Sequence, residues 1–298
     1  MLFASIDIGS NAVRLLFANV FEGKDRVRAD KASLIRIPIR LGMDVFETGR
    51  ISEARVKKLR DTMKAFSLLI GVYGPVSVAA CATAAMREAS NGMKVMKVIN
   101  RETGLNIRII NGEEEARIIS TFNHIIDPEG YDHTLYVDVG GGSTEMSLIS
   151  RDDFQVSHSF RIGTIRLIQD QVSESEWNSM RNWLRAHVSD LPSLRLIGSG
   201  GNINKLTKLY GDHITNTLSF EQLSAAEKTL RAMTLDARIR TIGLRPDRAD
   251  VILPAARIYR KVMKWTGLKE LTAPKIGLVD GLVLMLYEDW KRTENSQR

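Results

Sequence analysis

Cysteine and aromatic residues are scarce in this sequence, and both shortages restrict the class of protein. Its 298 residues include one cysteine, Cys81, so an internal disulfide is excluded. Cys81 lies in an apolar run at 76–82, and we expect a buried structural thiol in a reducing compartment. Aromatic residues make up 6% of the chain, and no basic run carries interleaved aromatics. A stacking platform for nucleic acid is therefore unsupported, and we expect no nucleic-acid partner.

Long hydrophobic runs are also missing. The longest apolar stretches, such as 282–286, are far too short to span a bilayer, so we expect no membrane association. No signal peptide is visible, because strand-like residues begin almost at Met1, and we expect a cytoplasmic protein. The surplus of 42 basic over 35 acidic residues leaves a formal charge of +7, which suits a polyanionic ligand.

Several common site motifs do not occur. The only Gly-Lys pair, at 23–24, is followed by Asp25, so the sequence has no P-loop. The glycine-rich turns at 140 and 198 lack the sixth-position glycine of a dinucleotide fingerprint, and no Gly-x-Ser-x-Gly elbow exists. Five scattered histidines make a zinc site an unsupported interpretation.

One motif is present twice. The segment 3–11 and the segment 135–145 each combine a β-rich apolar run, an Asp at its end and a turn of glycine and small hydroxyl residues. The two acids, Asp7 and Asp138, are 131 positions apart. Each copy predicts a hairpin whose turn directs backbone N–H groups outward as an anion nest, with an Asp placed to hold hydrated Mg²⁺. The alternative is an ordinary β-turn with Gly and Asp as turn formers.

Three further segments are candidates for the same chemistry. Thr83 and Arg87 follow a predicted strand and begin a helix, where a hydroxyl and a guanidinium can meet phosphate. A second turn, which also follows a strand and opens a helix, suits a nucleotide or phosphate; it consists of Gly198, Ser199, Gly200 and Gly201. The third segment is an acidic helix start at 113–115. The simpler interpretations are a plain helix start, a glycine-rich connection and a solvated helix terminus.

The order of elements predicts an α/β protein with two similar RNase H-like lobes around a central cleft. A hairpin at 3–20 and a third strand at 34–41 precede helices and strands that alternate, and the hairpin at 135–149 starts the second half. Pro128 marks a boundary between the halves. We expect one lobe at 1–128 that is completed by about 281–298, and a second lobe at 132–280.

These motifs together resemble the exopolyphosphatase/guanosine pentaphosphate phosphohydrolase family, which belongs to the actin and sugar-kinase superfamily. The similarity runs over almost the whole chain. Its remaining motifs are Arg40-Leu-Gly, Glu47-Thr-Gly-Arg-Ile-Ser52, Gly163-Thr-Ile-Arg166 and Arg248-Ala-Asp-Val251.

The resemblance implies a role for each matching residue. Glu115 matches the catalytic glutamate that orients and deprotonates the attacking water. Asp138 and Glu145 match the acids around Mg²⁺, with Asp7 nearby. The phosphate cradle corresponds to Gly9, Ser10, Asn11, Arg14, Thr83, Arg87, Gly140, Gly141, Gly142, Ser143 and Thr144.

The implied activity is Mg²⁺-dependent release of terminal phosphate from inorganic polyphosphate, or of the 5′ γ-phosphate from guanosine pentaphosphate, by a protein that we expect to form a homodimer. Two alternatives remain open: an ATP-dependent kinase of the same superfamily, and a non-catalytic sensor of guanosine tetraphosphate or polyphosphate. The sequence departs from the family pattern Gly-Leu-Arg-Glu-Gly near its end, where it has Val279 and Asp280. The lost cation leaves the preferred substrate and chain length open.

Overall fold

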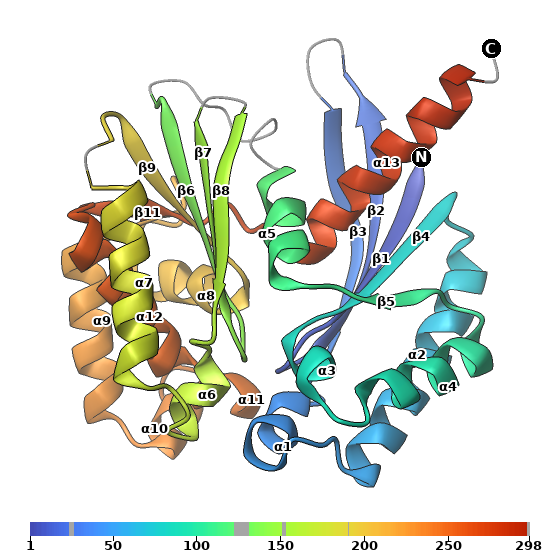
Figure 1. Cartoon of the computed structure of the whole chain (residues 1–298), viewed down its shortest axis with the longest axis horizontal. Coiled ribbons are helices and arrows are strands. Elements are labelled where there is room, and N and C mark those ends of the chain that lie inside the picture. The colour runs from blue at the N-terminus through green and yellow to red at the C-terminus, as the bar shows by residue number, and fades with distance from the viewer. Residues whose placement is uncertain (24–26, 122–130, 151–152, 190, 297–298) are drawn as a thin grey trace. The chain divides into compact units, whose positions relative to one another are not determined.

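The computed structural model describes residues 1–23, 27–121, 131–150, 153–189 and 191–296. Its contacts divide the chain into two compact units (Figure 1). Unit 1 comprises Met1–Ile125 and Leu278–Arg298, and unit 2 comprises Ile126–Gly277. Pro128, the predicted boundary, lies outside the described residues.

Unit 1 contains a five-stranded mixed sheet in the order β3-β2-β1-β4-β5. Its strands are β1 (Leu2–Ile8), β2 (Val13–Glu22), β3 (Val27–Ile37), β4 (Ser77–Ala82) and β5 (Ile107–Ile109). The first three pair antiparallel, and β4 and β5 continue the sheet in parallel. Its helices are α1 (Leu41–Thr48), α2 (Glu53–Tyr73), α3 (Ala84–Glu88), α4 (Gly92–Thr103), α5 (Gly112–Ser120) and α13 (Leu278–Ser296).

The last helix, α13, covers one face of the unit 1 sheet. Its residues Val279 and Val283 share a buried cluster with Phe3 of β1, and the Ser5 hydroxyl donates to the Val279 carbonyl at 2.6 Å. Successive side chains of a strand point to opposite faces, so Asp7 lies on the same face as Phe3 and Ser5. The end of β1 therefore presents its acid on the side where α13 packs.

Unit 2 contains a six-stranded mixed sheet in the order β10-β11-β9-β6-β7-β8. Its strands are β6 (His133–Val139), β7 (Thr144–Ser150), β8 (Asp153–Phe160), β9 (Leu194–Ser199), β10 (Thr217–Ser219) and β11 (Glu270–Thr272). Its helices are α6 (Thr164–Ile168), α7 (Glu174–His187), α8 (Gly201–Tyr210), α9 (Phe220–Ala232), α10 (Leu235–Arg240), α11 (Pro246–Ala249) and α12 (Ile252–Thr266).

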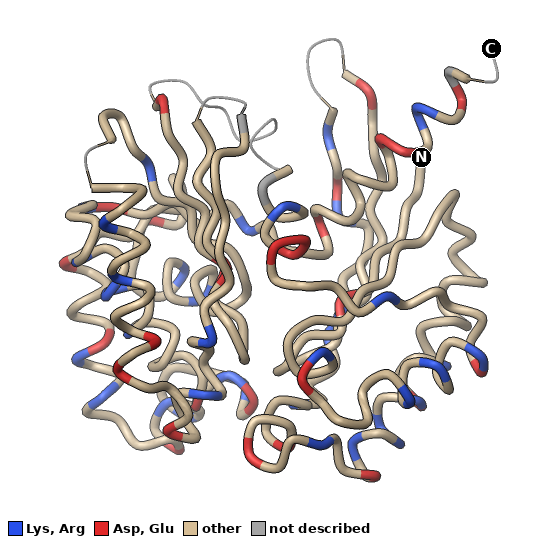
Figure 2. The backbone as a smooth tube through the Cα atoms, viewed as in Figure 1, with Lys and Arg blue, Asp and Glu red and all other residues tan. Residues whose placement is uncertain are grey.

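The core of unit 2 lies between its helices and one face of this sheet. Leu135, Val137 and Val139 of β6 alternate along the strand and join a single buried cluster with α7, α8, α9 and α12. Asp138 lies between two of these residues and therefore belongs to the opposite face. Figure 2 shows the same division, since charged residues are frequent on the helices and rare on the central strands.

The prediction of two similar α/β lobes is confirmed. In each unit an antiparallel hairpin and a third strand are followed by strands that extend the sheet in parallel. The predicted third strand was wrong at its end, because β3 stops at Ile37 and Leu41 begins α1. The backbone of Arg40, at φ 61°, is left-handed and ends the extended segment. Among the described residues, no helix has the length and apolarity to cross a membrane.

Candidate active site

The turn of the first hairpin, between β1 and β2, is anchored on one side by the segment that opens α1. The N–H of Gly9 donates to the carbonyl of Ala12 at 3.2 Å and closes the turn. Beyond β3, the amides of Arg40 and Gly42 donate to the carbonyls of Asn11 and Ser10, each at 2.9 Å. A peptide carbonyl and the next N–H point in opposite directions. The amides of Asn11 and Ala12 therefore point away from the start of α1, as an anion nest requires.

An ion pair lies beside this turn. Asp7 and Arg14 are direct partners across β1 and β2, and Nη1 of Arg14 lies 2.5 Å from Oδ2 of Asp7. Burial raises the pKa of the Asp7 carboxyl above its usual value, while the Arg14 charge and hydrogen bond act in the opposite direction. The sequence predicts a metal role for Asp7 and a phosphate role for Arg14, and the fold bonds the two residues to each other.

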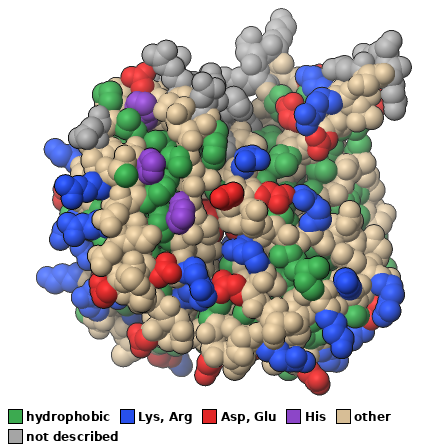
Figure 3. All heavy atoms as spheres, viewed as in Figure 1, with side chains coloured by type: hydrophobic (Ala, Val, Ile, Leu, Met, Phe, Trp, Pro, Cys, Tyr) green, Lys and Arg blue, Asp and Glu red, His purple; other side chains and the backbone are tan. Residues whose placement is uncertain are grey.

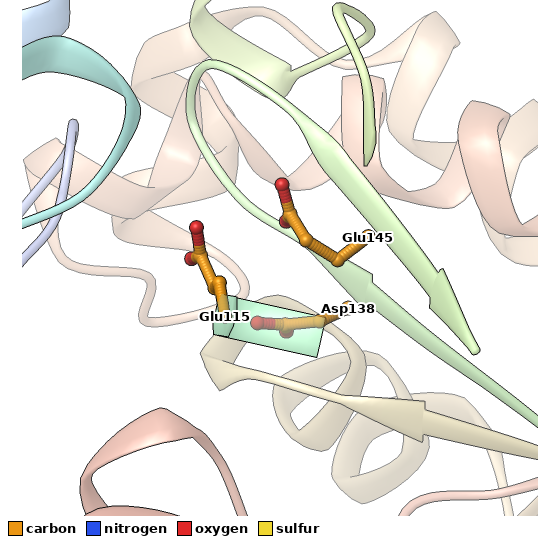
Figure 4. A group of neighbouring side chains, drawn as sticks. All are labelled: Glu115, Asp138 and Glu145. Carbon is orange, nitrogen blue, oxygen red and sulfur yellow. The ribbon is translucent and has the colours of Figure 1, made fainter. Parts of the chain in front are cut away.

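The second hairpin repeats this geometry with a different partner. Gly140 N–H donates to Ser143 O at 2.9 Å, and Asp138 lies directly opposite Glu145 across β6 and β7. Figure 4 labels both acids on these strands. Glu145 is buried and its Oε1 accepts a hydrogen bond from the Ser159 hydroxyl at 2.8 Å. Where unit 1 has an Asp–Arg pair, unit 2 therefore has two carboxylates.

The glycine turn of unit 2 is anchored by the segment that opens α6. The carbonyls of Gly140 and Gly141 accept the amides of Thr164 and Ile165 at 3.0 and 2.8 Å. The carbonyl of Gly142 accepts Nε–H of the buried Arg166 at 2.7 Å. Because all three carbonyls point toward this segment, the three amides that follow them point away from it. The result is a row of parallel N–H groups suited to phosphate oxygens.

This anchoring requires a glycine on the opposing segment. A Cβ on Gly163 would lie 2.3 Å from the carbonyl oxygen of Gly141. No side chain fits at that distance, so Gly163 permits the close approach of the two backbones.

A second glycine turn borders Asp138. Asp138 pairs in register with Ser199 at the end of β9, and the next residue, Gly200, has φ 96°. A Cβ on Gly200 would lie 2.8 Å from Oδ1 of Asp138. The strand includes Gly198 and Ser199, so the predicted turn is reduced to Gly200 and Gly201 at the start of α8. Two hard carboxylate oxygens beside N–H groups fit Mg²⁺ and a phosphate better than a soft metal.

In unit 1, the helix that carries Glu115 begins beyond β5. Asn111 caps α5 by accepting the Glu114 amide at 2.7 Å, which places three acids in the first turn. Glu113 is exposed and Glu114 pairs with Arg108 at 2.9 Å, as in a solvated helix start, whereas Glu115 is buried at 7% exposure. The pKa of Cys81 is raised well above its usual value by burial, then by the charges of Asp7 and Glu115. Glu115 and Asp7 therefore both lie near enough to Cys81, close to the end of β4, to raise the pKa of its thiol.

Thr83 and Arg87 lie at these strand ends as well. The Thr83 amide donates to the Ile8 carbonyl at 3.2 Å, and Thr83 is buried. Nη1 of Arg87 donates to the Ile110 carbonyl at 2.8 Å, so this guanidinium also joins α3 to the end of β5. A contact between the Arg87 side chain and phosphate stays a prediction.

Sequence reasoning missed two residues that shape the site of unit 2. The buried hydroxyl of Tyr259 lies 3.0 Å from the Val137 carbonyl and 2.8 Å from the Ser199 carbonyl, and it ties β6 to β9 beside Asp138. No local pattern marks Tyr259, because it reaches the strands from α12. Arg166 belongs to one of the motifs on which the resemblance rests. That motif does not indicate the hydrogen bond from the Arg166 guanidinium to the Gly142 carbonyl.

Val279 and Asp280, which differ from the pattern that the resemblance implies, make contacts within unit 1. Val279 is buried in the cluster between α13 and the sheet. Nζ of Lys31 lies 2.7 Å from Oδ1 of Asp280. Val279 thus takes part in packing and Asp280 in an ion pair within this unit.

Comparisons with known proteins show which family and which solved structures the chain is similar to. The model of the Ppx/GppA phosphatase family matches residues 33–289. The chain belongs to this family. It is 25% identical to Exopolyphosphatase 1 of Mycobacterium tuberculosis over 95% of this chain and 88% of that protein. The crystal structure of the Aquifex aeolicus family member aligns with a TM-score of 0.77 and 27% identity, over 97% of this chain and 98% of that one.

A longer relative shows the same similarity over part of its length. The chain is 27% identical to the bifunctional 3-dehydroquinate synthase/phosphatase of Fusobacterium nucleatum, over 89% of this chain. It spans only 44% of that relative's length.

Proposed function

We propose that this chain is a Mg²⁺-dependent phosphohydrolase that releases terminal phosphate from inorganic polyphosphate, or the 5′ γ-phosphate from guanosine pentaphosphate. The observation that carries the proposal is the second hairpin, where the Asp138–Glu145 pair adjoins a row of outward N–H groups. The carboxylate pair is suited to a cation, and the row of N–H groups is suited to phosphate oxygens. A metal ion bound beside a phosphate chain would therefore match both, whereas a neutral ligand would match neither.

In this proposal Asp138 and Glu145, directly opposite each other on β6 and β7 (Figure 4), hold one divalent ion, and Glu115 activates the attacking water. When bound, Mg²⁺ neutralises charge on the phosphate oxygens and the leaving group. Glu115 accepts a proton from the attacking water, whose oxygen bonds to the terminal phosphorus while the bond to the bridging oxygen breaks.

The remaining candidate residues orient the phosphate chain. We assign contacts with the phosphate oxygens to the backbone amides of the two hairpin turns, at 9–12 and 140–143, and to the guanidinium of Arg14. Thr83 and Arg87 add donors at neighbouring strand ends. Since phosphoryl transfer depends mainly on positioning and charge neutralisation, these groups supply what the reaction needs.

A substrate panel tests the proposal. The chain is incubated with Mg²⁺ and inorganic polyphosphate, guanosine pentaphosphate or ATP, and released phosphate is measured. We expect release from one or both of the first two. Release from ATP alone would overturn the proposal in favour of an ATP-using enzyme. Calorimetric binding of polyphosphate or guanosine tetraphosphate with no release from any substrate would favour the non-catalytic sensor.

A further inference from the structure

Unit 2 has a basic groove that is separate from its glycine turns. The groove encloses about 730 Å³ between α7 and α12, within the range of ligand-binding clefts. Three cations line it: Arg181 and Arg185 from α7, and Lys264 from α12. Figure 3 shows Lys and Arg side chains along the left edge of the view, over the side of unit 2 where Figure 1 places α7 and α9.

The polar groups of this groove are suited to an anion. Asn178, Arg181, Asn182 and Arg185 follow one another at spacings of three, one and three residues, so they share one face of α7. All four are exposed and can donate hydrogen bonds. Within the described part of the chain, no carboxylate lines the groove or forms an ion pair with its three cations. The groove therefore offers positive charge that no acid among the described residues neutralises.

Neighbouring residues of α12 extend the positive field. The pKa of Lys261 is lowered, first by burial and then by repulsion from Arg257. Its ammonium nitrogen lies 4.5 Å from the ring centroid of Trp177 and 5.1 Å from that of Trp265, which lines the groove. One face of the Trp265 indole is thus occupied by a cation.

We propose that this groove binds a segment of linear inorganic polyphosphate, as a second anion site apart from the glycine turns. Guanidinium and amide donors match phosphate oxygens. A nucleotide or single-stranded nucleic acid would also require an aromatic face for its base, and Lys261 already occupies one face of the Trp265 indole. The proposal shares its substrate class with the proposed function. It concerns binding alone and requires no hydrolysis.

The test compares two double variants of the full chain. Arg181→Gln with Arg185→Gln removes two charges from the groove. Lys228→Gln with Arg240→Gln removes two charges from exposed positions of the same unit, on α9 and α10. Binding of long-chain polyphosphate is measured by calorimetry in EDTA at several salt concentrations. Hydrolysis of tripolyphosphate with Mg²⁺ is measured in parallel.

We expect the groove variant to bind long-chain polyphosphate about tenfold more weakly than the wild type and with a smaller salt dependence, because fewer counterions are released. The control variant should bind like the wild type, and tripolyphosphate hydrolysis should be unchanged in both. Equal weakening in the two variants, or no weakening in the groove variant, would overturn the proposal. Equal wild-type affinity for single-stranded RNA of matched charge, lost in the same variant, would reassign the groove to nucleic acid.

These results separate the two proposals. A wild-type chain that binds long-chain polyphosphate through the groove but hydrolyses no substrate contradicts the proposed function and supports the groove. A chain that hydrolyses tripolyphosphate, with a groove variant that binds long chains normally, does the reverse.

Discussion

Asp7 and Arg14 face each other across β1 and β2, with 2.5 Å between Oδ2 of the acid and Nη1 of the guanidinium. The equivalent positions of the second sheet carry Asp138 and Glu145. Asp7 and Asp138 are each the last-but-one residue of the first strand of their unit, and each precedes a turn of the same length. The residue opposite the Asp is therefore a cation, Arg14, in unit 1 and an anion, Glu145, in unit 2. This difference in charge allows the two units to be tested separately.

Replacing Asp7 with Asn is expected to stabilise the fold. Burial raises the Asp7 pKa in the folded state, so this group favours folding below its unfolded pKa, and that contribution is lost as pH rises through the folded pKa. Asp7→Asn should therefore raise Tm at pH 7 and reduce the loss of Tm between acidic and neutral pH. Thermal unfolding across this range measures it. Asp61→Asn, at an exposed ion pair, is the control and should change Tm little. A lower Tm for Asp7→Asn at pH 7 contradicts the expectation.

Glu115→Gln should keep the fold and phosphate binding but lose most hydrolysis, by about 10²–10⁴-fold, because the amide cannot accept the proton of water. The rate of phosphate release from the preferred substrate is the measurement. Glu113→Gln changes an exposed acid in the same helical turn and should retain wild-type turnover. Near-wild-type turnover in Glu115→Gln would make Glu115 only an acid at a helix start.

Asp138→Asn should raise the Mg²⁺ concentration required for activity, because one negative charge of the carboxylate pair is lost. Phosphate release is titrated with Mg²⁺ at saturating substrate. A matched change at the equivalent acid of unit 1, Asp7→Asn, distinguishes an ion held by both hairpins from one held by the second. An unchanged titration for Asp138→Asn would remove this residue from the metal site.

Gly200→Ala should damage the site through Asp138. A Cβ on Gly200 would lie 2.8 Å from Oδ1 of Asp138, so the carboxylate must move. Gly243→Ala is the matched control, because Gly243 also has positive φ and nothing lies within 4 Å of its Cβ. Gly243→Ala should lose about 1 kcal/mol of folding free energy from left-handed backbone strain, and Gly200→Ala, at φ 96° and ψ 168°, should lose about 1–3 kcal/mol because that region is essentially restricted to glycine. Only Gly200→Ala should also require more Mg²⁺. Equal Mg²⁺ titrations in the two variants would show that Gly200 has no influence on Asp138.

Much of the fold was predictable because the signals are local. An Asp, a glycine turn and flanking β-rich runs specify each hairpin without help from distant residues. The capping residue Ser52 and the terminal Gly74 likewise mark the ends of α2. Strand ends were less certain, since the left-handed backbone of Arg40 has no glycine to announce it.

The support of the candidate site depends on contacts that no local pattern encodes. The glycine turn at 140–142 is anchored by residues about twenty positions away, and Tyr259 reaches the end of β6 from more than a hundred positions away. Side-chain partners of this kind follow from how helices pack on the sheet. The sequence therefore indicates which acids and glycines take part, while their supporting bonds are visible only in the folded chain.

The directly opposed carboxylates of unit 2 have a consequence for the energetics of the whole chain. Like charges that face each other across a strand pair disfavour the native state, and a divalent ion that binds there relieves this repulsion. Binding to the native form alone adds to the free energy of unfolding by mass action. If Mg²⁺ binds there, as the proposed function requires, folding and cation concentration are thermodynamically linked, and chelation should lower the free energy of unfolding before any substrate is present. The proposed function then makes the supply of free magnesium a condition for the stability of the native chain as well as for its turnover.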